Sequence, residues 1–396
     1  MCEVREVYIL GAVRTAIGNF LGTFKNFKAP ELGGFVIKEA VTRAGISAES
    51  VEEVIFGNVV SAGIGQASAK QAAVNGGLPF HVSCFSLNKV CGSGLKAVAL
   101  AAQAIWLEEK EIIVAGGMES MSQAPHLLWG AREGVKFGDL KLKDSMVLDG
   151  LWCAFDNHHM GNTGEIIAEK FGATRREQDE YAFFSHQKAL HAIERGYFKD
   201  EIVSVEVPQK KGDPIIFAED EGPRRDATLE RLSKLRPAFK KDGTVTAGNA
   251  SSLNDGAAAV VVVSEDAVKE KGLNPLARIL GTSTNAVEPG MVMYAPKGAI
   301  EKLLAHVGWK KEEVDLFEIN EAFSSQLVVL LKELGLDREK VNVHGGAVAL
   351  GHPIGATGAR ILTTLIHALK HRGFKKGVAS LCLGGGDAVA MAVEMV

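Results

Sequence analysis

Apolar residues follow two different spacings along the first 120 residues. Short stretches rich in apolar residues, which we interpret as strands, occupy residues 7–10, 51–59 and 111–115. Between them, residues 32–44 and 95–107 have helical spacing, and the second of these stretches is apolar on most sides. Glycines follow the first and last runs, so we expect those strands to end at Gly11 and Gly116. Strands that alternate with helices favour a largely parallel sheet, so the pattern predicts an α/β fold.

The same order of elements returns at the end of the chain. The corresponding segments are 278–281 with 8–11, 300–314 with 37–51, and the helix openings 355–358 with 91–94. Such self-similarity is the signature of a duplicated architecture. We therefore predict two duplicated α/β halves, packed so that their buried helices meet at the centre.

The segment between the halves differs from them in composition and pattern. Methionine, glycine and charged residues are more frequent there, and the alternation typical of strands is weaker. Thr174 and the charged residues after it are typical of a helix start, and we expect that helix to continue to Arg195. Inserted segments of this size are usually functional. The predicted domains are an N-terminal half of residues 1–120 and 254–272, a loop domain of 121–253, and a C-terminal half of 273–396.

Net charge, cysteine spacing and the length of the apolar runs argue against several classes of protein. The net charge of −4 gives no bulk electrostatic reason to bind nucleic acid. The five cysteines are widely spread, without the spacing of a disulfide framework or a zinc site, which favours a reducing compartment such as the cytoplasm. No apolar run reaches the roughly 18 residues of a membrane span, and the first ten residues lack the apolar core of a signal peptide.

Cys91 is the first candidate for chemistry. It lies between residues 88–90 and Gly92, at the turn into the apolar helix. Flanking glycines allow a tight turn and a close approach by another group. Backbone N–H groups and the helix dipole at this position predict a thiol pKa below the usual value of about 8.5. The competing interpretation is that Cys91 is a small hydrophobic residue in a core, as most free cysteines are.

The C-terminal half supplies partners for that thiol. His352 lies on a Gly-His-Pro turn before the second apolar helix, where an imidazole can accept a proton from a nearby thiol. Cys382 ends what we expect to be the last strand, before three glycines, and Asn320 follows a strand at 316–319. The duplication predicts that these groups converge with Cys91, where N–H groups of glycine turns can bind an oxyanion.

Seven motifs spread over the whole chain share one resemblance. They are residues 88–94 (NKVCGSG), 116–121 (GGMESM), 159–161 (HMG), 243–251 (GTVTAGNAS), 320–323 (NEAF), 345–360 (GGAVALGHPIGATGAR) and 382–386 (CLGGG). Together they resemble the thiolase family, and in particular its biosynthetic acetoacetyl-CoA type. The resemblance implies a thiolase-like α/β fold of two duplicated halves with central buried helices and an inserted loop domain.

The resemblance also implies a mechanism and a set of roles. Cys91 would attack acetyl-CoA and carry the acetyl group, and His352 would take the thiol proton. Cys382 would remove a proton from a second acetyl-CoA. Asn320 and His352 would form one oxyanion site, and the N–H groups of Cys91 and Gly384 the other. Coenzyme A thioesters enter as substrates, so neither a metal nor a separate cofactor is expected.

The resemblance places coenzyme A on the loop domain and its border. The matching positions are Leu151, His159, Met160, Arg224, Phe239, Ala247, Ser251, Leu253, Ala322 and Phe323. For Leu151, Leu253, Phe239 and Phe323, an ordinary core position is an equally good interpretation. The chain departs from the family pattern at Ser252, at residues 291–296, at Arg231 and at Asp387.

Two alternatives stay open from the sequence. One is a broad-specificity 3-ketoacyl-CoA thiolase of fatty-acid degradation, and the other is a thiolase-like lipid-binding protein without catalysis. The family implies a homodimer or homotetramer that works without nucleic acid or membrane. The basic stretch 132–143 is either an assembly loop or a solvated surface loop.

Overall fold

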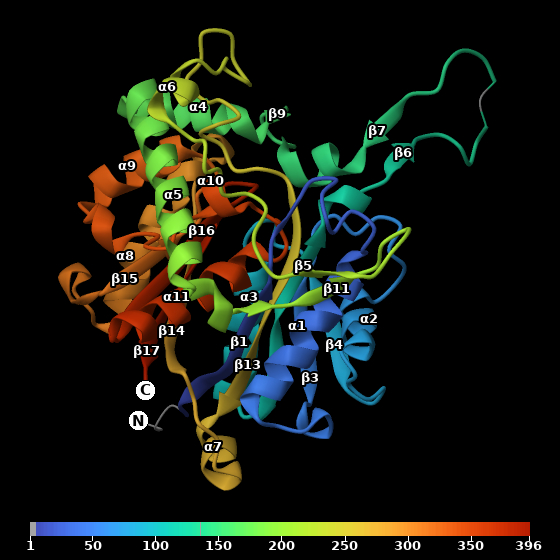
Figure 1. The fold of residues 1–396 in the computed structure, drawn as a ribbon, viewed down its shortest axis with the longest axis vertical. Coiled ribbons are helices and arrows are strands. Elements are labelled where there is room, and N and C mark those ends of the chain that lie inside the picture. The colour runs from blue at the N-terminus through green and yellow to red at the C-terminus, as the bar shows by residue number, and fades with distance from the viewer. Residues whose placement is uncertain (1–4, 135) are drawn as a thin grey trace.

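The computed structural model describes residues 5–134 and 136–396, so Cys2 lies outside the described part (Figure 1). Among the described residues the largest sheet has 11 strands. Its main path runs β15 (Leu316–Ile319), β16 (Lys376–Leu383), β17 (Asp387–Met395), β14 (Ala277–Ala286), β1 (Val7–Thr15), β13 (Asn254–Ser264), β5 (Ile112–Ser120), β3 (Glu53–Gly57) and β4 (Ser83–Leu87). The short strands β2 (Gly18–Asn19) and β10 (Ile202–Val203) pair with β13 and β1.

The strand order repeats itself on the two sides of the sheet. In the N-terminal half β1 pairs with β13, β13 with β5, and β5 with β3. In the C-terminal half β14, β17, β16 and β15 pair in the same order and with the same directions. The two rows join where β1 pairs with β14. The duplicated α/β architecture predicted from the sequence is therefore confirmed, while the predicted domain boundaries stay a prediction.

The sheet is mixed, and the expectation of a largely parallel sheet was wrong. Strand β13 is antiparallel to both of its neighbours β1 and β5, and β17 is antiparallel to β14 and β16. Strand β17 directly follows β16 through the turn at residues 384–386. A tight turn can join only antiparallel strands. The same turn shows that β16, which carries Cys382, is not the last strand.

The glycines that were expected to end strands lie inside them. Strand β1 continues past Gly11 to Thr15, and β5 continues past Gly116 to Ser120. A Cβ atom on Gly11 would collide with the carbonyl of Ala40 in helix α1 (Ala29–Ala44). Gly281 in β14 gives the same close approach to helix α8 (Ala295–Val307), where a Cβ would lie 2.9 Å from His306. Gly11 and Gly281 therefore allow helix-to-sheet packing rather than chain reversal.

Helices α3 (Ser93–Trp106) and α11 (Thr357–Arg372) lie at the centre of the molecule (Figure 1). Both contact strands of both halves, while α1 and α8 pack on β1–β13 and β14–β17, respectively. The two central helices cross at glycines, since a Cβ on Gly94 would lie 2.7 Å from the Ala359 nitrogen. This crossing brings the start of each helix, and the residues just before it, to one place.

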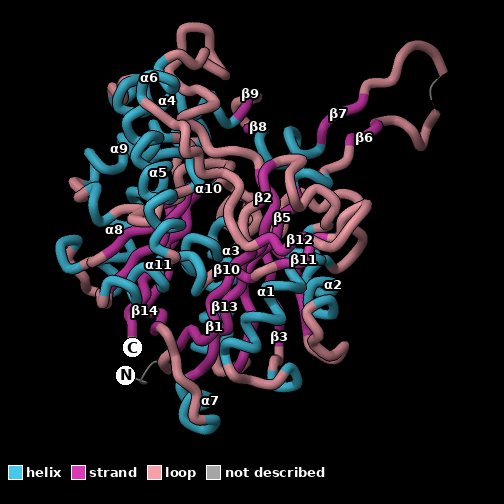
Figure 2. The backbone as a smooth tube through the Cα atoms, in the orientation of Figure 1, coloured by secondary structure: helices cyan, strands magenta, loops and turns pink. Residues whose placement is uncertain are grey.

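The segment between β5 and β13 is richer in loops than the halves (Figure 2). It carries helices α4 (Met160–Phe171), α5 (Arg175–Arg195) and α6 (Leu229–Ser233). Helix α5 begins as predicted, with Thr174 as its N-cap and a capping box to Glu177. Strands β6 (His126–Leu128) and β7 (Leu142–Asp144) form a hairpin that projects from the body (Figure 1). Among the described residues, no helix is both long and apolar enough to cross a membrane.

Candidate active site

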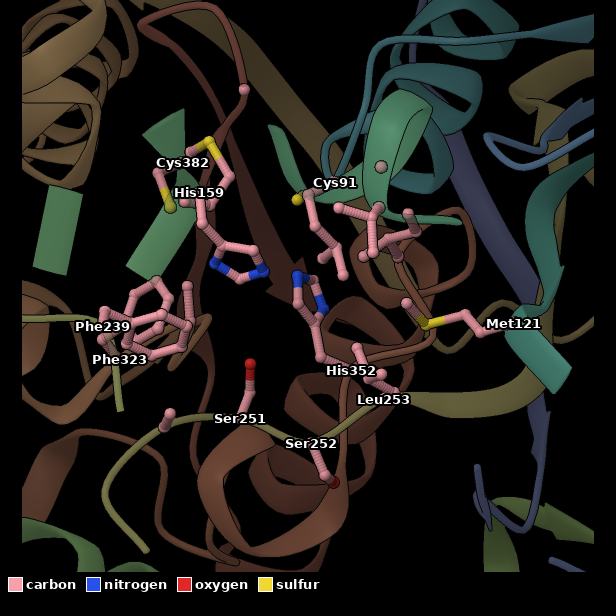
Figure 3. Close-up of a pocket in the computed structure, with 18 of the residues that line it drawn as sticks. Cys91, Met121, His159, Phe239, Ser251, Ser252, Leu253, Phe323, His352 and Cys382 are labelled. Carbon is pink, nitrogen blue, oxygen red and sulfur yellow. The ribbon is translucent and has the colours of Figure 1, made fainter. Parts of the chain in front are cut away.

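One cavity of about 490 Å³ lies where the two halves and the loop domain meet (Figure 3). Its walls include Cys91, His352, Cys382 and Gly384. They also include every position at which the sequence placed coenzyme A: Leu151, His159, Met160, Arg224, Phe239, Ala247, Ser251, Leu253, Ala322 and Phe323. Of the predicted site residues, only Asn320 is not on the wall. Residues separated by nearly the whole chain thus share one apolar chamber.

The turn that presents Cys91 is built differently from the sequence expectation. Val90 has φ 46°, a left-handed conformation that is unusual for a β-branched residue. The Ser93 hydroxyl holds this turn by donating to the Val90 carbonyl (2.6 Å) and accepting from the Lys89 N–H (2.8 Å). Gly92 has φ −80° and is required for space, because a Cβ there would collide with Leu383. Such strain before a reactive residue is typical of functional sites.

The Cys91 thiol is not acidified in the way its helix-start position suggested. Burial raises the pKa of Cys91 above its usual value, and the neighbouring Cys382 raises it further. The backbone N–H groups of Cys91 and Gly384 act in the opposite direction on this pKa but do not outweigh burial. The predicted direction was therefore wrong, because the apolar chamber penalises a thiolate more than the turn stabilises it. The same N–H groups lie where they can stabilise negative charge beside the sulfur.

The hydrogen bonds of His352 define which ring nitrogen carries its proton. The Thr357 hydroxyl donates to the Pro353 carbonyl (2.9 Å), so it accepts the hydrogen bond from His352 Nδ1 (2.7 Å). The proton therefore resides on Nδ1, and Nε2 has a free lone pair with no hydrogen-bond partner among the described residues. The ring points into the cavity below Cys91 (Figure 3). Burial lowers the pKa of His352 to about 3, so the imidazole is neutral and can accept a proton.

Glu119 is a buried group that sequence reasoning missed. Its carboxylate accepts hydrogen bonds from the N–H groups of Val59 (3.1 Å), Val60 (3.1 Å) and Gly355 (2.9 Å), and from the Asn58 amide (2.9 Å). It thereby ties the turn after β3 to the turn that carries His352. Burial raises the pKa of Glu119 to about 7 against these hydrogen bonds. The signal in the sequence was a lone glutamate at the end of an apolar strand, which requires buried partners.

Cys382 faces the same chamber from the end of β16. It is 2% exposed, and its sulfur lies 3.8 Å from the Met293 sulfur. Burial raises the pKa of Cys382 to about 12, and the side chain of Gln326 opposes this shift. Cys382 therefore rests as a thiol. Asp387, a departure from the family pattern, forms an ion pair with Lys89 and so links the turn after Cys382 to the turn before Cys91.

Asn320 is buried behind the cavity wall. It follows β15, and its backbone N–H donates to the Ser380 carbonyl (3.0 Å), which places it beside the end of β16. Both polar atoms of its side-chain amide lack a hydrogen-bond partner among the described residues. A buried amide without partners is costly in a folded protein. Its position thus differs from that of the other predicted site residues, although it directly follows β15, the strand that pairs with β16.

Aromatic rings form the opposite wall. His159 stacks on Phe239 with ring centroids 4.8 Å apart, and Phe239 meets Phe323 edge to face at 6.1 Å. His159 also caps helix α4 by accepting from the Gly161 N–H (3.0 Å). Burial lowers the pKa of His159, and the nearby His158 adds to this effect. Ser252 lines the cavity, whereas Arg231 is absent from its walls and pairs with Asp226 on the surface.

Comparison with known proteins agrees with this geometry. The family profile "Thiolase, N-terminal domain" matches residues 7–266, and "Thiolase, C-terminal domain" matches residues 273–395. The chain is 53% identical to the acetyl-CoA acetyltransferase of Pseudomonas aeruginosa over 388 residues, which covers 98% of this chain and 99% of the relative. It is equally similar, at 53% over 389 residues, to the acetyl-CoA acetyltransferase of Cupriavidus necator, with the same coverage.

A solved structure leads to the same result. The crystal structure of the Bacillus anthracis acetyl-CoA acetyltransferase superposes with a TM-score of 0.97 at 46% sequence identity, and the match covers 99% of each chain. Two family profiles that together span nearly the whole chain, and full-length relatives with about half of their residues in common, leave one assignment: this chain belongs to the thiolase family.

Proposed function

We propose that this chain is an acetyl-CoA C-acetyltransferase, which reversibly condenses two molecules of acetyl-CoA to acetoacetyl-CoA and coenzyme A. One observation carries the proposal: two thiols, Cys91 and Cys382, and a neutral imidazole, His352, line one cavity. The names of the full-length relatives support the same activity.

The first half-reaction transfers an acetyl group to Cys91. His352 Nε2 accepts the thiol proton as the sulfur attacks the carbonyl carbon of acetyl-CoA, and a new C–S bond forms. The N–H groups of Cys91 and Gly384 stabilise the oxyanion. When the C–S bond to coenzyme A breaks, the departing sulfur takes the proton of Cys382. The acetyl-enzyme is then accompanied by an imidazolium and a Cys382 thiolate.

The second half-reaction uses that thiolate as a base. Cys382 removes a proton from the methyl group of a second acetyl-CoA, whose carbonyl oxygen is stabilised by His352 and, from behind the wall, Asn320. The resulting carbanion attacks the acetyl carbonyl, and a C–C bond forms while the bond to Cys91 breaks. The Cys91 sulfur recovers its proton from His352. Every group returns to its initial state, so the cycle also runs backwards as thiolysis of a 3-ketoacyl-CoA.

Coenzyme A enters along the wall formed by the loop domain in this proposal. We assign the His159–Phe239 stack and Leu151 to the pantetheine arm, and Arg224, which also lines the cavity, to the negatively charged nucleotide phosphates. Met160, Ala247, Ser251, Leu253, Ala322 and Phe323 complete the wall. The thioester substrates supply all of the chemistry that the mechanism needs beyond the side chains.

Met293 lines the cavity with its sulfur 3.8 Å from the Cys382 sulfur, so its side chain occupies space beside the proposed base. We therefore place the chain with the acetoacetyl-CoA type rather than with broad-specificity 3-ketoacyl-CoA thiolases. Thiolysis rates for acetoacetyl-CoA and 3-ketooctanoyl-CoA, measured at equal concentrations, test this choice. Faster turnover of the longer substrate contradicts it.

Assembly into a homodimer or homotetramer is also part of the proposal. The hairpin β6–β7 exposes large apolar side chains, with Trp129 57% and Leu142 62% exposed, and the edge strand β4 exposes Phe85. Exposed apolar groups of this size mark association surfaces. The cysteines described by the structure are free, which supports a reducing, cytoplasmic location. Light scattering after size exclusion measures the oligomeric state.

Labelling with acetyl-CoA tests the proposed activity directly. Purified protein is mixed with radiolabelled acetyl-CoA, digested and mapped by mass spectrometry. We expect one acetylated peptide, modified at Cys91, and release of the label as acetoacetyl-CoA when excess acetyl-CoA is added. Binding of acetyl-CoA without any acetylated peptide supports the non-catalytic lipid-binding alternative instead.

A further inference from the structure

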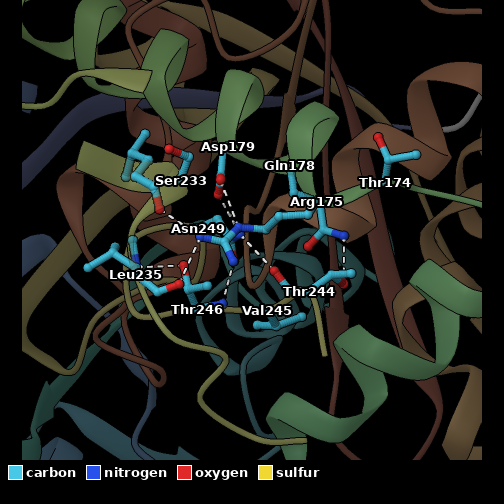
Figure 4. Close-up of polar contacts among 12 residues, drawn as sticks. Thr174, Arg175, Gln178, Asp179, Ser233, Leu235, Thr244, Val245, Thr246 and Asn249 are labelled. Atoms are coloured by element: carbon cyan, nitrogen blue, oxygen red, sulfur yellow. Dashed lines mark hydrogen bonds and ion pairs between the residues drawn. The ribbon is translucent and has the colours of Figure 1, made fainter. Parts of the chain in front are cut away.

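A polar cluster on the outer side of the loop domain fixes the wall on which coenzyme A is proposed to lie. Asp179, in helix α5, accepts hydrogen bonds from two neighbours through its two carboxylate oxygens (Figure 4). Arg175 Nε donates to one oxygen (2.7 Å), and Asn249 Nδ2 donates to the other (2.9 Å). Asp179 is 4% exposed and Asn249 is fully buried, so this contact is shielded from water. None of these three residues lines the cavity.

Asn249 uses its amide to shape the segment that does line the cavity. Its oxygen accepts from the Thr246 N–H (2.8 Å), and its nitrogen donates to the Thr244 carbonyl (3.1 Å) as well as to Asp179 (Figure 4). The turn that results places Ala247 and Ser251 on the cavity wall. A single buried side chain thus satisfies backbone groups on both sides of the turn, as an ordered loop requires.

The same cluster holds a second part of the wall. Arg175 Nη2 donates to the carbonyls of Leu232 (2.6 Å) and Leu235 (3.1 Å), at the end of helix α6. The chain that leaves this helix carries Phe239 to the cavity. The two parts also pack together, because a Cβ on Gly248 would lie 2.7 Å from the Leu232 side chain. Movement of Arg175 or Asp179 would therefore shift both parts of the cavity wall, the turn around Asn249 and the segment that carries Phe239.

The turn continues directly into the residues beside the reacting groups. The Asn249 carbonyl accepts from the Ser324 N–H (2.8 Å), and the Ser251 N–H donates to the Ala322 carbonyl (3.0 Å). Ala322 follows Asn320 along the chain. Near the other end of the turn, the Glu165 carboxylate of α4 accepts from the Thr244 N–H, so the segment is held from three elements. From α5, Asp179 contacts Asn249 in the middle of the turn, while Gln178 Nε2 donates to the Thr244 hydroxyl near its end (2.9 Å).

We propose that Asp179 is a positioning residue for coenzyme A binding, which acts through Asn249 and Arg175 on the wall at residues 235–251. The inference rests on the proposed placement of coenzyme A against this wall. A carboxylate suits this position because Arg175 and Asn249 donate to different oxygens, and both of its oxygens are acceptors. An asparagine in its place would turn its own N–H₂ toward one of those donors. The consequence is a displaced wall and weaker binding of the thioester, with the reacting groups intact.

The test compares Asp179→Asn with a matched control on the same helix. Arg176 and Glu180 form an ion pair of the same spacing one residue further along (2.8 Å), but on the solvent side, where Arg176 is 89% exposed. Glu180→Gln therefore removes an equivalent charge without contact to the wall. Four quantities are measured for each protein: KM and kcat for thiolysis of acetoacetyl-CoA, the melting temperature, and the rate at which iodoacetamide alkylates Cys91. Iodoacetamide is small and does not use the coenzyme A wall.

We expect Asp179→Asn to raise KM about tenfold, the effect of losing one charge-assisted buried hydrogen bond. We expect its kcat within about twofold of the unmodified protein, and the alkylation rate of Cys91 unchanged. Glu180→Gln should leave KM, kcat and the alkylation rate of Cys91 at their original values. An unchanged KM in folded Asp179→Asn overturns the proposal, and so does a fall in kcat and alkylation rate as large as the rise in KM, since that would indicate general damage to the site.

A second variant decides the matter if Asp179→Asn does not fold. Arg175→Lys, at a side chain that is 24% exposed, keeps the charge beside Asp179 but loses the fork that reaches Leu232 and Leu235. A raised KM with normal alkylation of Cys91 supports the proposal, and an unchanged KM overturns it. Failure of the proposed function is distinguishable, because then the unmodified protein itself shows no thiolysis of acetoacetyl-CoA.

Discussion

The substitution Thr357→Val tests how the fold sets the protonation of its histidine. Valine keeps the shape of threonine but removes the hydroxyl that accepts from His352 Nδ1 at 2.7 Å. Thr357 is fully buried, so no solvent replaces the lost acceptor. The His352 ring then gains nothing from carrying its proton on Nδ1, and the tautomer with the proton on Nε2 becomes populated. In that tautomer Nε2 cannot accept the proton of Cys91.

The magnitude follows from the value of one buried hydrogen bond. A neutral hydrogen bond of this kind contributes about 1–1.5 kcal/mol, and its loss changes the ratio of the two tautomers roughly tenfold. A ratio that falls from about ten to one to about one to one lowers the fraction of rings with a free Nε2 about twofold. We therefore expect the rate of acetyl-enzyme formation from acetyl-CoA, followed by rapid quench and intact-protein mass spectrometry, to fall at least about twofold. The KM for acetyl-CoA should change little, because Thr357 is not on the cavity wall.

The same helix offers a matched control. Thr363 is also fully buried in α11, and its hydroxyl has no hydrogen-bond partner among the described residues. Thr363→Val makes the same chemical change without touching His352, and we expect it to acetylate at the original rate. If both variants acetylate equally fast, Thr357 does not select the tautomer and the reasoning fails.

Three further predictions follow from the same geometry. Cys91→Ser should abolish the acetylated peptide, whereas Cys382→Ser should still form it but lose condensation to acetoacetyl-CoA by at least about a hundredfold; equal loss of both steps in Cys382→Ser contradicts the assigned roles. Because the pKa of Cys91 is raised, its alkylation by iodoacetamide should increase roughly tenfold per pH unit between pH 7 and 9. Since the pKa of His352 is lowered to about 3, the plot of this alkylation rate against pH should show no step near pH 6.5. An alkylation rate that reaches a plateau below pH 8 contradicts the raised pKa of Cys91. Gly358→Ala places a Cβ 2.8 Å from that of Leu95, where the central helices cross, and should lower the free energy of unfolding in urea by about 1–3 kcal/mol or more.

The sequence was sufficient for the duplicated order of elements but not for the directions or the extent of the strands. The duplicated order of elements could be predicted because hydrophobic spacing and glycine positions are properties of the chain itself. The ends of β1 and β5 could not, because a glycine looks the same whether it reverses the chain or admits a helix. At Gly11 the deciding contact is Ala40 in α1, and at Gly116 it is Ala258 in β13. Both contacts exist only after the chain has folded.

Some residues of the candidate site could likewise be predicted from the sequence, and others could not. Residue type and motif placed Cys91, His352 and Cys382 together, and the structure puts all three on one cavity. The turn at Val90 escaped notice, since its left-handed conformation is maintained by Ser93 and by packing rather than by a glycine. Asp179 could not be predicted from a local motif, because its proposed positioning role depends on a hydrogen bond from Asn249, 70 positions away in the sequence.

The direction of the Cys91 pKa shows why local chemistry was misleading. A helix start stabilises a thiolate through nearby N–H groups, and those groups are present at Cys91 and Gly384. Their effect is smaller than the desolvation imposed by walls drawn from both halves of the chain. The same desolvation lowers the pKa of His352, so the cause that keeps the thiol protonated also keeps its base neutral.

A site that rests without charge has a consequence for the order of events. Transfer of a proton from Cys91 to His352 creates two charges in an apolar chamber, which is unfavourable until negative charge can move onto a substrate oxygen held by backbone N–H groups. In the proposed mechanism, proton transfer and attack on the thioester are therefore coupled, and the resting thiol reacts slowly with other electrophiles at neutral pH. The N–H groups of Cys91 and Gly384 are already fixed by the turns at residues 90–93 and 384–386, so they need no rearrangement as the oxyanion forms. In the proposed mechanism, the N–H groups that lie beside the resting sulfur are thus already in place for the charge that develops on the substrate oxygen.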